Sequence, residues 1–283
     1  MHKLLKILLK FNYIFMKFFK YHGTGNDFIC IDNNKKNISI NSQEIKKLCD
    51  RNFGIGADGV ILMTPSDNGG DVFMDYWNSD GSFAEMCGNG VRVTALFIEK
   101  NWGIEKKELL IDTRDGIKKV ISKGDNSYQV NMEEAKFVHS DFPSQSEILF
   151  DKENHFASMG NPHSVINFSS EKECDIYFKK YAKKIESNRD LFPNKINVNA
   201  FWKKGEKHFG QKTFERGAGL TLACGTGASA SFAWIQKLFP ETRGEKIKMD
   251  IPGGTLFFEM NTKNNTNEIL MTGPAQFVFK GSL

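Results

Sequence analysis

The chain has 283 residues, of which 40% are hydrophobic and 25% are charged, and its formal net charge is +4. This length exceeds one typical domain of roughly 100 to 200 residues, so we expect two domains. The composition excludes a disordered or low-complexity chain. Three of the excess positive charges, Lys3, Lys6 and Lys10, belong to the first fifteen residues. The rest of the chain therefore gives no electrostatic basis for a nucleic-acid partner.

Residues 1–15 are basic and leucine-rich, and we expect them to be an N-terminal extension outside the fold. Lysines interrupt every apolar run there, whereas a secretory signal needs an apolar run of about 7 to 15 residues and a cleavage site. The lysines lie opposite leucines at helical spacing, so a helix on a membrane surface is the alternative. A second methionine, Met16, comes directly before a predicted strand. A chain that begins at Met16 is therefore expected to fold and to function.

In the first half, apolar runs predict four strands and one helix before the first sequence motif. The strands are expected at 18–22, 28–32, 60–64 and 72–78. A helix capped by Ser42 is expected to run to Asn52. A polar loop then leads to Cys87, which is followed by a long apolar stretch that predicts a helix.

The second half repeats this order of elements. Strands are expected at 156–159, 164–168 and 196–203 and in the segment before Glu215, with a helix from Ile176 to about Asn188. A Gly-rich loop then leads to Cys224 and a second long apolar helix. The last segment, 275–283, reads as a strand.

The two halves are copies of one pattern. CGNGVRVTALFIEK begins at Cys87 and CGTGASASFAWIQK begins at Cys224, which is 137 residues later. The same offset, without a gap, pairs Asn78 with Glu215. HGTGNDF and GNPHSV stand 61 and 63 residues before their respective cysteines. A repeat of this kind indicates a duplicated fold with two pseudo-symmetric domains.

The apolar runs VILM and VFMD indicate sheets that are buried on both faces. We therefore predict an α+β fold in which each half is a mostly antiparallel or mixed, barrel-like β-sheet. Each sheet is expected to wrap around the helix that follows its cysteine. These two helices would then be the central helices of the two domains.

The CGxG turns predict two activated thiols. Glycine lets the chain turn tightly and lets backbone N–H groups approach a ligand. A helix N-terminus leaves up to four N–H groups unpaired and carries about half a positive charge, which favours a bound carboxylate. The same field is expected to lower the pKa of Cys87 and of Cys224. Each half therefore offers an anion site beside a reactive thiol.

Other cofactor chemistry is not indicated. The five cysteines are an odd number without a CxxC pair, the six histidines show no metal-helix spacing, and no phosphate loop occurs. We predict neither a metal nor a nucleotide cofactor. Cys30, Cys49 and Cys174 are expected to be inert buried thiols, and the chain is expected to be cytoplasmic.

Two thiols suit the inversion of a chiral carbon. A proton must leave one face of the carbon and another must arrive at the opposite face, so an acid and a base are needed on the two sides. Hydrogen-bond donors at the carboxylate would stabilise the carbanion, so no pyridoxal lysine is required. The thiol and thiolate would titrate as a pair.

The sequence from Met16 onward resembles the diaminopimelate epimerase family. The resemblance rests on FKYHGTGNDF, RNFGIGADG, NSDGSFAEMCGNG, MGNPHSV, FPNKIN, FERGAG and LACGTGA. It implies interconversion of LL- and meso-diaminopimelate without a cofactor, on the route to lysine and peptidoglycan, with Cys87 and Cys224 as proton donor and acceptor. It implies a supporting role in catalysis for His163 and Glu215. The substrate-binding residues that it implies are Asn26, Asn78, Gly88, Asn89, Asn161, Asn197, Glu215, Arg216, Gly225 and Thr226.

The resemblance also implies a discontinuous first domain, because the C-terminal segment returns to it. We expect residues 16–132 with 272–283 to form this domain and residues 133–271 to form the second, with the active site in the cleft between them. The sequence departs from the family at Gly59, where some members carry a glutamine that contacts substrate. That contact is not expected here.

Alternatives remain at this point. Proline and hydroxyproline racemases resemble the same architecture, but they generally carry a histidine where this chain has Asn89, and Arg216 would not suit proline. A redox-sensing protein could join Cys87 and Cys224 in a reversible disulfide. His163 could be merely structural. The expected partner is a small-molecule substrate, without nucleic acid or membrane, and a homodimer is one option for the assembly.

Overall fold

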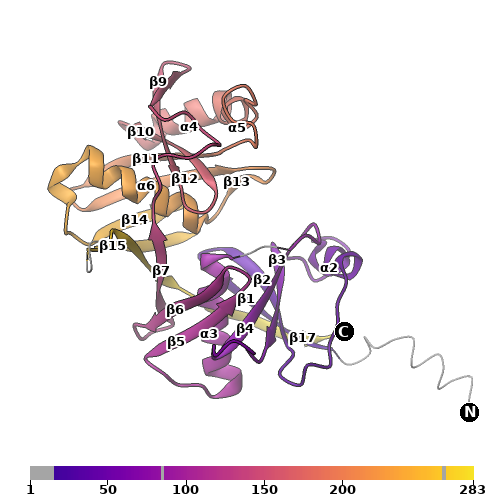
Figure 1. Cartoon of the computed structure of the whole chain (residues 1–283). Helices are drawn as coiled ribbons and strands as arrows, with labels where there is room; N and C mark the ends of the chain where they lie inside the picture. The colour runs from indigo at the N-terminus through magenta and orange to yellow at the C-terminus, as the bar shows by residue number, and fades with distance from the viewer. Residues whose placement is uncertain (1–15, 84–85, 263–265) are drawn as a thin grey trace, which may run out of the picture. The chain divides into compact units, whose positions relative to one another are not determined.

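The structure is a computed structural model that describes residues 16–83, 86–262 and 266–283 (Figure 1). The predicted extension 1–15 lies outside the described residues. Contacts divide the chain into two units. The first unit holds the described residues up to Gly23, Asp27–Ser122 and Ala275–Leu283, and the second holds Thr24–Asn26 and Lys123–Pro274. The C-terminal segment therefore lies with the N-terminal part of the chain.

The first unit is a mixed sheet around a central helix. Its strands are β1 (Lys17–Gly23), β2 (Asn26–Asp32), β3 (Gly59–Thr64), β4 (Val72–Asn78), β5 (Glu108–Thr113), β6 (Gly116–Ser122) and β17 (Gln276–Ser282). β2 pairs with β3 and β4 with β5 in parallel, whereas β1–β17, β3–β4 and β5–β6 are antiparallel. The central helix α3 (Gly88–Trp102) packs against β1, β4, β5 and β6 (Figure 1). Its first eleven residues are all buried.

The second unit repeats this arrangement with additional strands. These are β7 (Ser127–Glu134), β8 (Glu147–Leu149), β9 (Lys152–Ser158), β10 (Pro162–Phe168), β11 (Asn197–Gly205), β12 (His208–Glu215), β13 (Gly219–Thr221), β14 (Ile247–Ile251), β15 (Gly254–Asn261) and β16 (Glu268–Pro274). The central helix α6 (Gly225–Leu238) packs against β9 to β12 and β16. β7 pairs with β16, which places β7 in the second unit although the expected boundary fell near its end.

The register of the strands confirms the duplication. Val60 of β3 pairs with Trp77 of β4, and Val198 of β11 pairs with Phe214 of β12. Each pair joins the strand that leads toward a cysteine to its antiparallel neighbour. The strand that follows each central helix is also paired in the same way in both units, because β4 runs parallel to β5 and β12 runs parallel to β14. The predicted α+β fold of two sheets around two helices is therefore correct.

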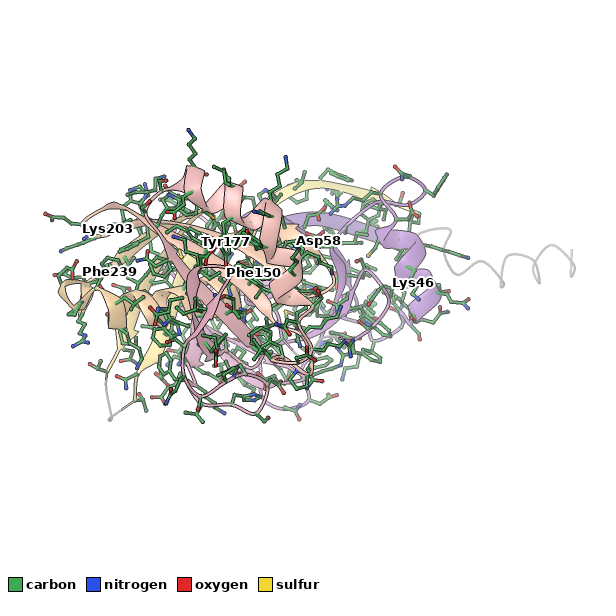
Figure 2. The ribbon with its side chains drawn as sticks, turned by 90° about the horizontal axis from the view of Figure 1, so that it is seen from above. Lys46, Asp58, Phe150, Tyr177, Lys203 and Phe239 are labelled. Atoms are coloured by element: carbon green, nitrogen blue, oxygen red, sulfur yellow. The ribbon has the colours of Figure 1, made fainter. Side chains whose placement is uncertain are left out.

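A second helix covers the outer face of each sheet. In the first unit, α2 (Ser42–Cys49) buries Ile45, Leu48 and Cys49 against residues of β2 and β3. In the second unit, α4 (Glu171–Tyr177), the π-helical turn Phe178–Ala182 and α5 (Lys183–Glu186) have the same role. Tyr177 and Phe150, both labelled in Figure 2, lie where α4 meets β8, and the Tyr177 hydroxyl donates to the Leu149 carbonyl at 2.6 Å.

Three predicted helix boundaries are wrong. α2 is capped by Asn41 rather than Ser42, because Asn41 Oδ1 accepts from the N–H groups of Gln43 and Glu44 while Glu44 accepts from the Asn41 N–H. The helix ends at Cys49 because the Asp50 side chain accepts the next N–H groups at 2.8 Å. The second helix begins at Glu171 rather than Ile176.

Ser170 sets the start of that second helix, because its side chain accepts from the Glu173 N–H. No helix in residues 16–83, 86–262 and 266–283 is both long and apolar enough to cross a membrane.

Candidate active site

Both cysteines of the repeated motif are helix N-caps. Cys87 precedes α3 and its sulfur accepts from the Gly90 N–H at 3.4 Å, while Cys224 precedes α6 and its sulfur accepts from the Gly227 N–H at 3.3 Å. The sulfur therefore occupies the place that an oxygen of serine or asparagine usually takes at an N-cap. The prediction that both thiols sit where a central helix begins is confirmed.

The predicted lowering of the Cys224 pKa is wrong. Burial of the thiol, which is 7% exposed, raises its pKa well above the ordinary value, and the carboxylate of Glu215 raises it further. The Gly227 N–H and the Thr226 hydroxyl act in the opposite direction, but loss of water outweighs them. Cys224 therefore carries its proton at neutral pH.

The surroundings of Cys87 have the opposite charge. Arg92, on α3, is fully buried, and its guanidinium donates to Asn89 Oδ1 at 2.8 Å. Burial lowers the Arg92 pKa to about 10, so the side chain stays charged at neutral pH, and it interacts electrostatically with Cys87. A buried positive charge favours a thiolate over a thiol. Arg92 was not predicted from the sequence, although a charged residue inside an apolar helix was a visible signal.

Glu215, Thr226 and Cys224 gather at the start of α6. Thr221 donates its hydroxyl to Glu215 Oε1 at 2.5 Å, and Thr226 Oγ1 lies 3.5 Å from the sulfur of Cys224. The backbone is tightly packed here, since a Cβ on Gly225 would lie 3.3 Å from Cε of Met271. The helix can therefore begin at this position only with a residue as small as glycine or with a displaced neighbour.

His163 is a neutral buried histidine. It is inaccessible to solvent, its Nε2 lies 2.8 Å from Asn161 Oδ1, and its Nδ1 lies 3.1 Å from Asn199 Nδ2. Burial, followed by the nearby charge of Arg216, lowers its pKa to about 3. His163 therefore carries no positive charge at neutral pH, and Asn161, Asn199 and His163 form one hydrogen-bonded group.

Asn197 ties the start of β10 to the turn that carries Arg216. Its Oδ1 accepts from the Arg216 N–H at 3.0 Å and its Nδ2 donates to the Pro162 carbonyl at 3.0 Å. The Arg216 guanidinium donates to the Asn194 carbonyl at 3.0 Å. The structure thus brings Asn161, Asn197 and Arg216 together at neighbouring strand ends.

Glu186 supports the same turn and was not found in the sequence. It is fully buried at the end of α5 and accepts from the Gly217 N–H at 3.2 Å and from Lys183 at 2.8 Å. A buried carboxylate needs such partners. Glu186 therefore fixes the backbone next to Arg216.

Asn26 is the first residue of β2, and Asn78 is the last residue of β4. The Asn78 amide donates to Ser82 Oγ at 3.0 Å, and Asn78 is the register partner of Gly59. A Cβ on Gly59 would lie only 2.6 Å from Cε2 of Tyr76. The Tyr76 ring therefore fills the space that a larger residue at position 59 would need.

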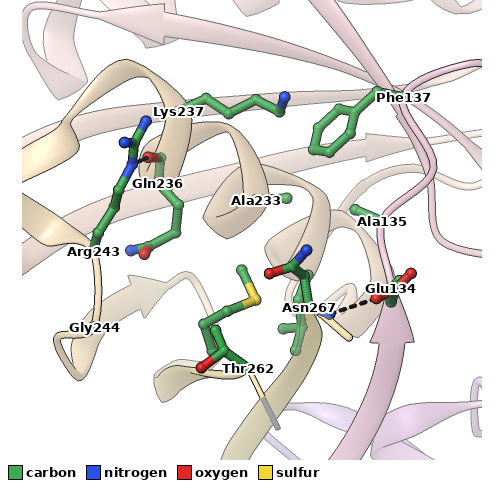
Figure 3. A pocket seen from close by; sticks show the side chains of 12 residues that line it. Glu134, Ala135, Phe137, Ala233, Gln236, Lys237, Arg243, Gly244, Thr262 and Asn267 are labelled. Atoms are coloured by element: carbon green, nitrogen blue, oxygen red, sulfur yellow. Dashed lines mark hydrogen bonds between the residues drawn. The ribbon is translucent and has the colours of Figure 1, made fainter. Parts of the chain in front are cut away.

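A separate cavity of about 430 Å³ lies at the other end of α6 (Figure 3). Its lining includes Phe137, Gln236, Arg243 and Asn267 but none of the predicted site residues. α6 has 14 residues, so its two ends are roughly 20 Å apart at 1.5 Å per residue. The cavity is therefore distinct from the residues around Cys224. Across the described ranges, no three histidine, cysteine or acidic side chains are grouped to hold a metal ion.

Comparison with known proteins identifies similar chains over almost the full length. A sequence profile described as diaminopimelate epimerase matches residues 18–138 and 155–278. A diaminopimelate epimerase of Leptospira biflexa is 36% identical over 285 residues, covering 95% of this chain and 99% of the relative. One from Trichodesmium erythraeum is 38% identical, covering 93% of this chain and 98% of the relative.

Solved structures share the fold at much lower identity. A PhzF-family phenazine biosynthesis protein from Bacillus anthracis has a TM-score of 0.69 at 16% identity, covering 95% of this chain and 98% of the other. A hydroxyproline epimerase from Agrobacterium vitis has a TM-score of 0.66 at 13% identity, covering 95% and 91%. At identities this low, the similarity to these solved structures concerns the fold alone. The sequence similarity is to diaminopimelate epimerases.

Proposed function

This chain belongs to the diaminopimelate epimerase family, and we propose that it interconverts LL- and meso-2,6-diaminopimelate without pyridoxal phosphate. The reaction would supply lysine and peptidoglycan precursors. One observation carries the proposal. The two cysteines are the N-caps of equivalent central helices in the two copies of a duplicated fold.

We propose that the two thiols exchange protons with the two faces of one carbon. The charges around them suggest the resting state: Cys87 beside the Arg92 guanidinium is the thiolate, and Cys224 beside Glu215 is the thiol. Cys87 would remove the α-proton and Cys224 would return a proton to the opposite face. The reverse reaction would start from the opposite protonation state. The pair exchanges one proton, so no other acid or base is consumed.

The carbanion needs stabilisation at the carboxylate, where its charge develops. The first-turn N–H groups of a helix have no acceptor within the helix. We propose that those of Gly88, Asn89, Gly225 and Thr226 bind the carboxylate at the reacting centre.

Arg216 would bind the distal carboxylate, because a guanidinium fits a carboxylate with two hydrogen bonds. Asn26, Asn78, Asn161 and Asn197 would hold the other polar groups of the substrate. His163 is buried and neutral, so its role would be to orient Asn161 rather than to carry a proton.

The proposed enzyme needs both thiols reduced and one of them ionised. A reducing compartment preserves thiols, so we propose that it works in the cytoplasm on a small-molecule substrate. The division into two domains, predicted as 16–132 with 272–283 and 133–271, remains part of this proposal, with β7 assigned to the second domain.

The direct test is epimerisation of LL-diaminopimelate by purified protein under reducing conditions, followed by chiral chromatography. In heavy water, the product should acquire deuterium at the inverted carbon. L-Proline serves as the alternative substrate. Turnover of proline but not of diaminopimelate would assign the chain to the racemases instead.

The matched variants are Cys87→Ala and Cys224→Ala, with Cys174→Ala as the control for loss of a buried thiol on α4. Each of the first two should reduce turnover about a thousandfold or more, while Cys174→Ala should retain it. A Cys87→Ala or Cys224→Ala protein with near-normal turnover would remove that thiol from the mechanism. Oxidation should inactivate the enzyme and a reductant should restore it, whereas a redox switch would show no epimerisation in either state.

A further inference from the structure

A line of hydrogen-bonded polar side chains crosses the interior of the second unit behind the candidate site. All but the last of its members are almost entirely buried, and they come from three neighbouring strands and the turn before them. The line runs through Gln211, Thr213, Asn199, His163 and Asn161. Burial of polar groups is unfavourable unless every group is hydrogen-bonded, so this line needs a reason to exist.

The orientation of the Asn199 amide is fixed by its neighbours. One side of the amide lies 3.0 Å from the Ser164 carbonyl, which can only accept, so that side must be the NH2 group. The other side lies 2.9 Å from the Thr213 hydroxyl and is therefore the oxygen. Thr213 can donate to it because its own oxygen accepts from Gln211 at 2.6 Å.

The orientation of Asn199 sets the tautomer of His163. The Asn199 NH2 group also lies 3.1 Å from His163 Nδ1, so Nδ1 must accept and cannot carry a proton. In a neutral imidazole the proton is then on Nε2. Nε2–H donates to Asn161 Oδ1 at 2.8 Å. The NH2 group of Asn161 is thereby the part of its amide that remains to donate to a ligand.

Asn199 and Thr213 also lie against the start of α6. A Cβ on Gly227 would be 2.3 Å from Asn199 Oδ1 and 2.7 Å from Thr213 Oγ1. Gly227 in turn donates its N–H to the sulfur of Cys224. Asn199 and Thr213 therefore lie against the backbone that holds the thiol, and Asn199 also contacts the histidine.

We propose that Thr213 and Asn199, supported by Gln211, are positioning residues that hold His163 as the Nε2–H tautomer, so that Asn161 presents its NH2 group to the substrate. The inference rests on the proposed function, because Asn161 acts there as a substrate-binding residue. It also defines the ligand chemistry at Asn161. The group bound there is a hydrogen-bond acceptor, such as a carboxylate oxygen, and not an ammonium.

Thr213→Val removes the hydroxyl while nearly keeping the shape, and Thr213→Ser keeps the hydroxyl. Without the Thr213 donor, the Asn199 oxygen has no hydrogen bond, and the Ser164 carbonyl alone still holds the amide. Rotation of the amide then gives the oxygen the Nδ1–H of His163 as donor at the cost of the contact with Ser164. This rotation favours the Nδ1–H tautomer and turns the Asn161 oxygen outward. For Thr213→Val we expect KM for diaminopimelate to rise roughly tenfold to a hundredfold with a smaller change in kcat. Thr213→Ser should restore the KM of the unchanged protein.

The tautomer is read directly from the ¹⁵N resonances of His163, assigned by their loss in His163→Gln. The unchanged protein and Thr213→Ser should show the proton on Nε2, and Thr213→Val should show it on Nδ1. Ser231→Ala is the control, because it removes another buried hydroxyl, which donates to the Gly227 carbonyl at 3.0 Å. It should leave both the tautomer and KM as they are.

An Nε2–H tautomer with KM within twofold in Thr213→Val would overturn the inference. If Thr213→Val does not fold, Asn199→Asp replaces it, since a carboxylate can only accept and must draw the proton to Nδ1. An unchanged tautomer in Asn199→Asp would equally overturn the inference. Absence of diaminopimelate turnover in the unchanged protein would contradict the proposed function, while the ¹⁵N measurement would still test the hydrogen-bonded line.

Discussion

The two units build the same framework around their central helices and fill it differently. In the first unit, Phe28 and Tyr76 make an edge-to-face contact with ring centroids 5.7 Å apart, and Ile61 packs against Gly90 of α3. The shared register and the 137-residue offset give the corresponding positions of the second unit. His163 corresponds to Phe28, Asn199 to Ile61 and Thr213 to Tyr76. An apolar filling is therefore sufficient for this fold, and the polar filling of the second unit must serve something else.

The same contrast continues at the two thiols. Arg92 is buried on α3 and interacts with Cys87, while its counterpart on α6 is the uncharged Ser229. Glu215 raises the pKa of Cys224, while its counterpart in the first unit is Asn78. The starts of α3 and α6 are duplicates, but the charged side chains near their cysteines have opposite signs. A reaction that removes one proton and returns another needs one thiolate and one thiol at its start.

The largest expected effect comes from placing the polar residue of one unit in the other. Ile61→Asn should lower the free energy of unfolding by about 3 to 5 kcal/mol, because it loses apolar burial and has no partners equivalent to His163 and Thr213. Urea unfolding would measure this. Ile61→Val is the control and should cost about 1 kcal/mol. Equal stability of the two variants would mean that the first unit tolerates a polar filling as well.

The next effect concerns the charge beside Cys87. Arg92→Met should reduce kcat/KM near neutral pH about a hundredfold, because the thiolate loses its positive neighbour, and activity should recover as pH rises. Its stability should change little, since a buried charge is replaced by an apolar side chain of similar length. Ser229→Ala, at the corresponding position of α6, should keep its activity. A pH–rate profile of Arg92→Met identical to that of the unchanged protein would contradict the assignment of Cys87 as the thiolate.

The smallest expected effect is a difference between the two units in how their stability depends on pH. The His163 pKa is about 3 in the folded chain and about 6.5 in the unfolded chain. The unfolded state therefore binds a proton that the folded state does not, and stability falls as pH drops below about 6.5. Between pH 6.5 and 5 the loss is about 2 kcal/mol. Hydrogen exchange of β10 amides should accelerate accordingly.

Asp27 gives the first unit a different acid response. Its burial is outweighed by hydrogen bonds from Arg51 and Lys20, which lower its pKa to about 2. The stability that it contributes is present above its ordinary pKa and is lost only as pH falls from about 4 to 2. β2 amides should therefore keep their protection at pH 5. His163→Phe, which copies Phe28, should abolish the pH 5 effect in β10, and its persistence there would contradict this account.

Much of the fold was predictable from the sequence because its signals are local. Apolar runs mark the strands, glycines mark the turns before the two helices, and a constant offset between Cys87 and Cys224 reveals the duplication. The start of α2 was misplaced by one residue because Asn41 and Ser42 are both good caps, and only the hydrogen bonds of Glu44 distinguish them.

The sequence by itself therefore determined the two-copy architecture and the thiols at the helix starts. Only the tertiary structure decided that Cys224 keeps its proton, and it added Arg92, Glu186 and Asn199 to the site. The physical reason is that ionisation depends on burial and on hydrogen bonds between distant positions. Asn199 meets His163 across 36 residues and Glu186 meets Gly217 across 31, and no local pattern in the chain encodes either contact.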